Sequence, residues 1–212
     1  MTGLELRTLR LIAITDDLRD GPTGLLARSA AAVRGGATMV QLRLKAVEPR
    51  ALVEVARVLV QALSVPVIVN DRVDVALAAG AAGVHLGADD LAPAAARTIV
   101  PAGFIIGASV GEEREVADAR AADYVGIGPV YPTGSKADAG PAIGIARFQR
   151  LAALVDRPAV AIGGIAPETI RAVIEGGAAG VAVIRAVLGA ADPEGAARTL
   201  RLAMGDIMEH EE

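Results

Sequence analysis

The sequence predicts an α/β protein that folds as a single (βα)8 TIM barrel. Three observations lead to this class: the alternation of elements, the composition and an internal repeat. Eight short apolar runs occur along the 212 residues, with apolar helical segments between them. Strands that alternate with helices indicate a parallel sheet, and eight such units of this size close most naturally into a barrel. Hydrophobic residues make up 53% of the chain and aromatic residues only 2%, which suits parallel strands buried on both faces.

The elements follow in chain order. The first strand is expected at 9–15, followed by a turn at Gly21 and Pro22 and an Ala-rich helix over about 23–34. Pro49 stands where a helix begins, and that helix should run to about Leu63. The remaining strands are expected at 40–43, 66–70, 83–86, 104–109, 124–128, 159–163 and 181–184.

An internal repeat supports this count. The segments 35–43, 79–87, 119–128 and 176–185 share a helix end, a small-residue turn and a strand, and would supply strands two, four, six and eight. Gly80 and Gly177 stand where a glycine ends a helix. Any βα protein repeats such turns, so the repeat concerns architecture and not function. We expect one domain over 1–212, with a core at about 9–205 and a solvated acidic end at 208–212.

Composition excludes several classes of protein. The chain has no cysteine, which rules out disulfides, thiolate metal sites and cysteine nucleophiles and is compatible with a reducing cytoplasm. The net charge of −4 argues against a nucleic-acid-binding protein. No apolar run is long enough to cross a membrane, and the first residues lack a signal-peptide pattern. We therefore expect a soluble, cytoplasmic protein without nucleic-acid or membrane partners.

Polar residues and glycines stand at nearly every predicted strand end, where barrels of this kind carry out their chemistry. Gln41, Arg43 and Lys45 alternate, so their side chains point to one face of strand two. The other strand-end features are Asn70, Asp71, His85, Asp89, Asp90, Ser109, the 133–136 loop, Gly163, Gly164 and Arg185. His85 is as well explained by a hydrogen-bonded core residue, and we assign it no role.

Charges of both signs would meet at this barrel mouth. The cations are Arg43, Lys45 and Lys136, and the carboxylates are Asp71 and Asp90. Such a set suits pyrophosphate bound with Mg2+, because the metal bridges anionic oxygens to the carboxylates while Lys and Arg hold the remaining oxygens. A set of rim salt bridges is the alternative, and for any one pair it is the commoner case.

The stretch GIGPVYPTGSK at 126–136 is suited to phosphate oxygens. Thr133 and Ser135 offer hydroxyls, Gly134 allows close approach of the backbone, and Lys136 adds a positive charge. The stretch lacks the GxxxxGK[ST] order of a P-loop, and a polar turn whose lysine faces water is the alternative.

A second anion site is expected after strands seven and eight, where such barrels commonly bind phosphate on backbone N–H groups. Gly163 and Gly164 allow close approach, Pro167 could begin the next helix, and Arg185 could add a bidentate contact. The alternative is that these glycines have only a structural role, because ordinary turns also contain glycine. Together the two sites predict two phosphorylated groups that face each other across one mouth.

These motifs resemble the thiamine-phosphate synthase family. The matching segments are QLRLK, NDRVDVAL, GVHLGADD, IGASV, GPVYPTGSK, AIGGI and GVAVIRA, between about Leu11 and Leu188. The resemblance implies a Mg2+-dependent transferase that joins hydroxymethylpyrimidine diphosphate to hydroxyethylthiazole phosphate and releases pyrophosphate. Its partners would be these small phosphorylated substrates, and the sequence leaves open whether the chain forms a homo-oligomer.

The resemblance also implies roles for individual residues. Pyrimidine diphosphate would contact Gln41, Leu42, Arg43, Leu44, Lys45, Asn70, Ser109 and Lys136, of which Arg43, Lys45 and Lys136 would be catalytic. Asp71 and Asp90 would hold Mg2+. Thiazole phosphate would contact Thr133, Gly134, Ser135, Gly164, Ile184 and Arg185. The chain departs from the usual family pattern at Ile12, Leu44, Gly111, Ala182 and Arg185, where the family usually has an aromatic, an acidic residue, a His and two Ser.

Two other functions fit parts of the same pattern. A thiazole tautomerase, an isomerase on the same barrel, resembles the chain in the IGGI, VHLG and PTGSK regions, but Pro129 and Asp90 favour the synthase. The other alternative is a barrel that binds thiamine intermediates without turnover. The set of Asp71, Asp90 and Lys136 argues against it, because a phosphate binder needs no metal site beside a leaving group.

Overall fold

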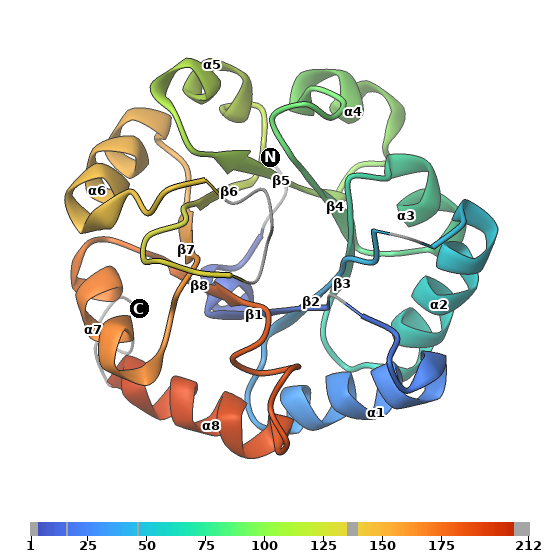
Figure 1. Ribbon diagram of the computed structural model, residues 1–212. Helices are drawn as coiled ribbons and strands as arrows, with labels where there is room; N and C mark the ends of the chain where they lie inside the picture. The colour runs from blue at the N-terminus through green and yellow to red at the C-terminus, as the bar shows by residue number, and fades with distance from the viewer. Residues whose placement is uncertain (1–3, 16, 46, 135–139, 206–212) are drawn as a thin grey trace.

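The computed structural model describes residues 4–15, 17–45, 47–134 and 140–205. Its strands form one closed parallel barrel in chain order, and β8 pairs with β1 (Figure 1). The strands are β1 (Leu11–Ile14), β2 (Met39–Leu42), β3 (Val67–Asn70), β4 (Gly83–Leu86), β5 (Ile105–Val110), β6 (Tyr124–Ile127), β7 (Ala159–Ile162) and β8 (Gly180–Val183). The predicted (βα)8 class is confirmed.

A ring of helices surrounds the barrel (Figure 1). These helices are α1 (Gly21–Arg34), α2 (Pro49–Ala62), α3 (Val73–Ala79), α4 (Pro93–Ile99), α5 (Val116–Ala119), α6 (Gly144–Val155), α7 (Pro167–Glu175) and α8 (Pro193–Met204). Two 3-10 helices, η1 (Leu6–Leu9) and η2 (Glu113–Glu115), complete the described elements. In the part of the chain that the structure describes, no helix has the length and apolar character needed to span a membrane.

Two predicted boundaries near the N-terminus were wrong. Leu9 belongs to η1 and not to the first strand, and it is fully buried among side chains of the barrel interior. Burial at the barrel end requires the same apolar side chain as burial in a strand, so the residue type alone does not separate Leu9 from the strand that follows it. Gly21 and Pro22 form the first turn of α1 instead of a separate turn, because proline fits a first helical turn, where its missing N–H costs nothing.

The alternation of side chains along each strand divides the apolar residues into two layers. One layer lies between the strands and the helices. The other fills the barrel interior and includes Ile12, Met39, Ile68, Tyr124 and Val160. The interior residues therefore form a packed floor inside the barrel. Inward-facing side chains nearer the carboxyl end of each strand lie above this floor, at the barrel mouth.

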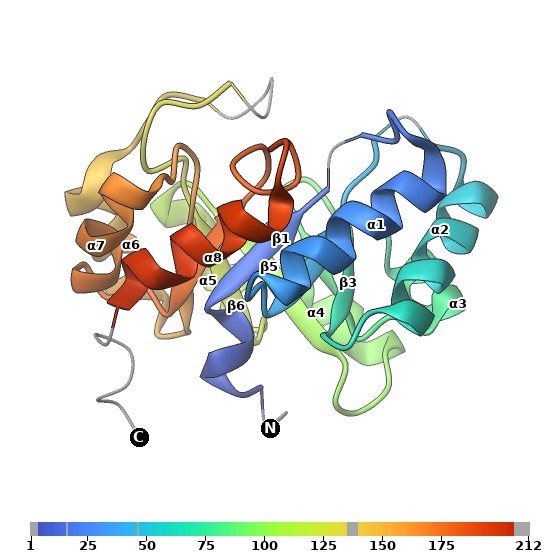
Figure 2. The same ribbon diagram turned by 90° about the horizontal axis from the view of Figure 1, so that it is seen from below.

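The two ends of the barrel differ (Figure 2). At one end η1, in deep blue, crosses beneath the strands. A Cβ atom at Gly180 would lie 2.0 Å from the Leu9 carbonyl oxygen, so the glycine permits this crossing. At the opposite end the loops that follow β6 and β8 extend beyond the barrel, and they carry residues of the predicted site.

Candidate active site

The β1 and β2 ends are fastened by one buried threonine. The Thr15 Oγ1 accepts a hydrogen bond from the Arg43 N–H at 2.8 Å and donates to the Arg43 carbonyl at 3.1 Å. The Thr15 N–H donates to the Gln41 carbonyl at 3.0 Å. These bonds extend the strand geometry past the end of β2. Arg43 therefore keeps the inward alternation of Gln41, and the two side chains are only 9% and 4% exposed.

Gln41 and Asn70 form a polar pair inside the barrel. The Gln41 Nε2 donates to the Asn70 Oδ1 at 2.7 Å, across the neighbouring strands β2 and β3. Both residues line an interior cavity of about 60 Å3 together with Arg43. The alternation places Leu42 and Leu44 on the outer side, buried against the helical layer. Any ligand contact of these two leucines would therefore come from their backbone. The Lys45 side chain, at the end of this segment, is exposed.

Asp71 and Asp90 are both anchored to the end of β4. The Asp71 N–H donates to the His85 carbonyl at 2.8 Å, and the Asp90 Oδ2 accepts from the Gly87 N–H at 2.7 Å. Asp71 has φ of 64°, a conformation that costs a non-glycine residue free energy and that often marks a functional position. Asp156 shares this conformation, but it ends α6, where a left-handed residue has a purely structural explanation.

Within the described residues, no group of three or more His, Asp or Glu side chains could enclose a metal ion by itself. Two carboxylates from neighbouring strand ends nevertheless suit Mg2+, which usually keeps several waters and is held by one or two carboxylates plus substrate phosphates. The donor chemistry of Asp71 and Asp90 fits that ion.

A polar chain of Tyr124, His85 and Ser109 crosses the barrel interior. The Tyr124 hydroxyl lies 2.9 Å from the His85 Nδ1, and the His85 Nε2 lies 3.1 Å from the Ser109 Oγ. Burial raises the pKa of the Tyr124 hydroxyl above its usual range, so the hydroxyl keeps its proton. The sequence placed His85 at a strand end without a partner. Tyr124 was missed because it reads as an ordinary residue of an apolar strand.

A larger cavity of about 180 Å3 opens at the mouth over β5 to β8. Its lining includes Ser109, Thr133, Gly163, Gly164, Ile184 and Arg185. Ser109 lines the interior cavity as well, so the two cavities adjoin. The mouth cavity therefore brings together most of the described residues that were predicted to hold thiazole phosphate.

Close packing of the loops forms the wall of this cavity. Gly163 and Gly164 have φ of 92° and 64°. A Cβ atom at Gly164 would lie 2.6 Å from the Tyr131 Cβ, so no larger residue fits without movement of the loop after β6. An Arg185 Nη2 atom lies 3.1 Å from where a Cβ of Gly134 would stand. The loops after β6, β7 and β8 thus meet at one place. Ser135 and Lys136 lie outside the described residues.

Four of the five positions that depart from the family pattern also line these cavities, and the fifth, Leu44, is buried against the helical layer. Ala182 lines both of them, Ile12 lines the interior one, and Gly111 lines the one at the mouth. Gly111 and Ala182 make the walls less polar than a His and a Ser would, whereas Arg185 adds a charge to the mouth cavity.

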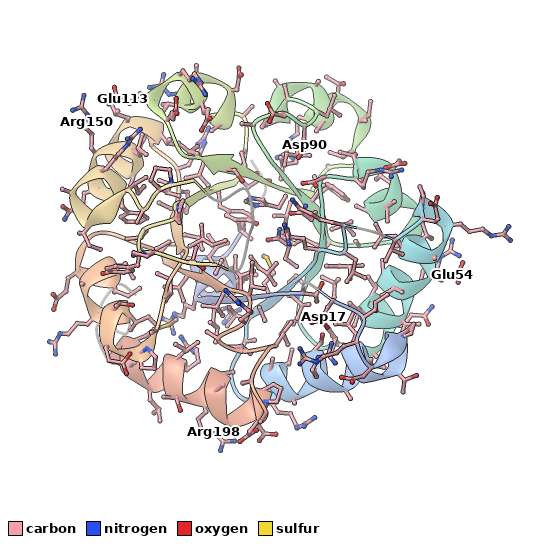
Figure 3. The ribbon with its side chains drawn as sticks, viewed as in Figure 1. Asp17, Glu54, Asp90, Glu113, Arg150 and Arg198 are labelled. Carbon is pink, nitrogen blue, oxygen red and sulfur yellow. The ribbon has the colours of Figure 1, made fainter. Side chains whose placement is uncertain are left out.

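Salt bridges of the outer helices provide a contrast. Figure 3 shows Glu113, Arg150, Glu54 and Arg198 at the outer margin of the helical ring, while Asp90 lies inside that ring, between β4 and α4. Arg150 and Glu113 are a typical exposed pair, at 2.9 Å. Such pairs contribute little to stability.

A closed parallel barrel with polar residues gathered at the carboxyl ends of its strands defines the class: this is a (βα)8-barrel enzyme. The family model for thiamine monophosphate synthase matches residues 11–187. The chain is 50% identical over 201 residues to the thiamine-phosphate synthase of Xanthobacter autotrophicus, covering 92% of this chain and 95% of the relative. It therefore belongs to the thiamine monophosphate synthase family.

Two further comparisons agree. The thiamine-phosphate synthase of Methanoculleus marisnigri is 52% identical over 181 residues, which cover 83% of this chain and 85% of the relative. The solved structure of the thiamine phosphate pyrophosphorylase from Pyrococcus furiosus superposes with a TM-score of 0.84 at 38% identity and covers 96% of this chain and all of that one. The resemblance that the motifs indicated is confirmed.

Proposed function

We propose that this chain is a thiamine-phosphate synthase, a transferase of thiamine biosynthesis. It would condense 4-amino-2-methyl-5-(diphosphooxymethyl)pyrimidine with hydroxyethylthiazole phosphate to give thiamine phosphate and pyrophosphate. The observation that carries this proposal is the family membership, with relatives named for this activity that match nearly the whole chain. The predicted cytoplasmic location stays a prediction.

The diphosphate would be held at the ends of β2, β3 and β4. Arg43 and Lys45 would bind its oxygens, together with Lys136, while Asp71 and Asp90 would hold Mg2+. When bound there, Mg2+ would neutralise the negative charge that develops on the departing pyrophosphate. The pyrimidine would enter the interior cavity, where the Gln41 and Asn70 pair offers donors and acceptors to a planar heteroaromatic ring.

The thiazole phosphate would occupy the mouth cavity over β6 to β8. Backbone N–H groups near Gly164 and Ile184 and the guanidinium of Arg185 would bind the phosphate, and Thr133 lines the same cavity. Gly134 and Ser135, which follow Thr133 in the sequence, are proposed to contribute as well. This arrangement would direct the thiazole ring toward Ser109, which lies where the two cavities adjoin.

The chemistry needs little from a general acid or base. Because the pyrimidine is electron-rich, its bond to the diphosphate oxygen can break first and leave a pyrimidine methylene cation, which the thiazole nitrogen then captures. The main task of the protein would be to stabilise the leaving group with preorganised charges. No nucleophilic side chain is required, which agrees with a chain that has no cysteine.

The test is pyrophosphate release by the purified protein with both substrates, with each substrate alone, and with Mg2+ or EDTA. We expect release only when both substrates and the metal are present. Conversion of a thiazole precursor tautomer without pyrophosphate release would instead identify a thiazole tautomerase. Binding of the substrates without either reaction would identify a binding protein.

A further inference from the structure

The interior chain of Tyr124, His85 and Ser109 joins three neighbouring strands, β6, β4 and β5. Two glycines make the room for it. A Cβ atom at Gly107 would lie 2.3 Å from the Tyr124 Cζ, and one at Gly126 would lie 3.1 Å from the His85 Cε1. The tyrosine and histidine rings lie with their centroids 5.6 Å apart. The barrel interior is thus shaped around this chain, and the reaction proposed above assigns a role to Ser109 but none to Tyr124 or His85.

The surroundings of Tyr124 determine the direction of its hydrogen bond. The residue is 1% exposed and packs among the apolar side chains of the interior. A buried O–H group requires an acceptor. Among the described residues, this hydroxyl has one hydrogen-bond partner, the His85 Nδ1. The hydroxyl therefore donates and Nδ1 accepts.

The tautomer of His85 follows from that bond. A neutral imidazole carries one hydrogen, and since Nδ1 accepts, this hydrogen is on Nε2. The Nε2–H then donates to the Ser109 Oγ at 3.1 Å. The proton of the Ser109 hydroxyl is therefore not directed at His85 and is left for another acceptor. The opposite tautomer would turn Ser109 toward His85 and present only its lone pairs to the cavities.

We propose that Tyr124 and His85 are positioning residues that fix Ser109 as a hydrogen-bond donor toward the substrate. Ser109 lies where the interior and mouth cavities adjoin, so its proton faces the place where the reacting groups would meet. The acceptor would be a diphosphate oxygen or a ring nitrogen of the pyrimidine. This acceptor rests on the proposed function, whereas the tautomer of His85 does not.

The first experiment measures the tautomer directly. The chain contains two histidines, His85 and His210, so in tag-free, 15N-labelled protein a His210→Gln variant leaves one imidazole to observe. We expect long-range 1H–15N spectra to show the proton on Nε2 in the otherwise unchanged protein, and an appreciable population with the proton on Nδ1 in Tyr124→Phe. A proton on Nδ1 without the Tyr124 substitution would overturn the proposal, whether or not the protein is an active synthase.

The second experiment measures the consequence for turnover. We expect Tyr124→Phe to lower kcat by about 10- to 100-fold, the effect of one hydrogen bond to a charged group, with little change in KM for thiazole phosphate. Thr98→Val is the control, because it removes an exposed side-chain hydroxyl from α4, outside the barrel, and should leave kcat unchanged.

A double variant separates positioning from a general structural role. In a Ser109→Ala background the Tyr124 hydroxyl has no donor left to orient, so Tyr124→Phe should lower kcat by less than about twofold more. Losses that multiply would show that Tyr124 acts independently of Ser109 and would overturn the proposal. Thermal unfolding of each variant verifies that the compared proteins are folded.

Discussion

The two halves of the barrel mouth provide different kinds of groups for anions. At the ends of β2 to β4 the groups are charged side chains: Arg43 and Lys45 follow β2, Asp71 follows β3 and Asp90 follows β4. At the ends of β6 to β8 most of the wall is backbone and small residues, with Arg185 as the cation among the lining residues described. Anion binding in the first half would depend on side-chain charge. Anion binding in the second half would depend on the close approach of the loops.

This difference matches the fates of the two anions in the proposed reaction. The diphosphate gains charge as it leaves, so groups that bind it more strongly in the transition state raise kcat. The thiazole phosphate keeps its charge throughout, so groups that bind it act equally on the ground and transition states and lower KM. We call the ends of β2 to β4 the charged half of the mouth and the ends of β6 to β8 the glycine half. Substitutions in the charged half should therefore change kcat, and substitutions in the glycine half should change KM for thiazole phosphate.

The largest effect is expected from Arg43→Gln. Arg43 is nearly buried and held at the end of β2 by Thr15, so its guanidinium is a preorganised charge. We expect kcat to fall by about 100- to 1,000-fold, as it does when one preorganised donor is removed from other active sites. Arg50→Gln, at an exposed position of α2, is the matched control and should leave kcat unchanged. A change confined to KM would contradict the division between the two halves.

The next effect concerns the metal. Asn at position 90 can still accept the Gly87 N–H, so Asp90→Asn removes the charge while it preserves the turn. We expect the Mg2+ concentration for half-maximal activity to rise by about 10- to 100-fold, the range known for losses of single groups around metal sites. The neighbouring Asp89 is exposed, and Asp89→Asn is the matched control. Equal Mg2+ dependence in the two variants would exclude Asp90 as a metal residue.

The sequence predicts which face of a strand a side chain occupies better than it predicts which residues of other strands that side chain contacts. The period of two along β2 is enough to place Gln41 and Arg43 inward and Leu42 and Leu44 outward, as the structure has them. The partner of His85 could not be predicted in this way. It depends on the register of β4, β5 and β6, in which Gly107 pairs with both His85 and Tyr124, and register is a property of the closed barrel.

The same distinction applies to loops. Glycines after β7 suggest close approach, but the residues they approach come from the loop after β6 and are known only from packing. The mostly apolar segment at 9–15 likewise did not reveal that Leu9 lies outside the strand, in η1, and is buried at the floor of the barrel.

In the glycine half, Gly164→Ala tests the close approach. The new Cβ would lie 2.6 Å from the Tyr131 Cβ and 2.7 Å from the Pro132 carbonyl oxygen, so the two loops must separate. We expect KM for thiazole phosphate to rise about tenfold, equivalent to about 1.4 kcal/mol of binding, with kcat nearly unchanged. Gly80→Ala is the control, because Gly80 has a similar φ of 70° but no atom within 4 Å of the new Cβ. It should reduce the free energy of unfolding by about 1 kcal/mol and leave KM unchanged.

The smallest effect is expected from Arg185→Ser, which introduces a serine such as the family usually has in this loop. A serine hydroxyl and the backbone still donate to the phosphate, so KM for thiazole phosphate should rise only about 3- to 10-fold, less than the full loss of a hydrogen bond to a charged group would cause. The sharper measurement is salt dependence. An attraction between Arg185 and the phosphate weakens as salt screens it, so KM of the unchanged protein should rise more steeply with ionic strength than KM of the variant. Parallel salt dependences would show that Arg185 acts by packing against the loop at Gly134, its neighbour at the cavity rim, and that the backbone alone holds the phosphate.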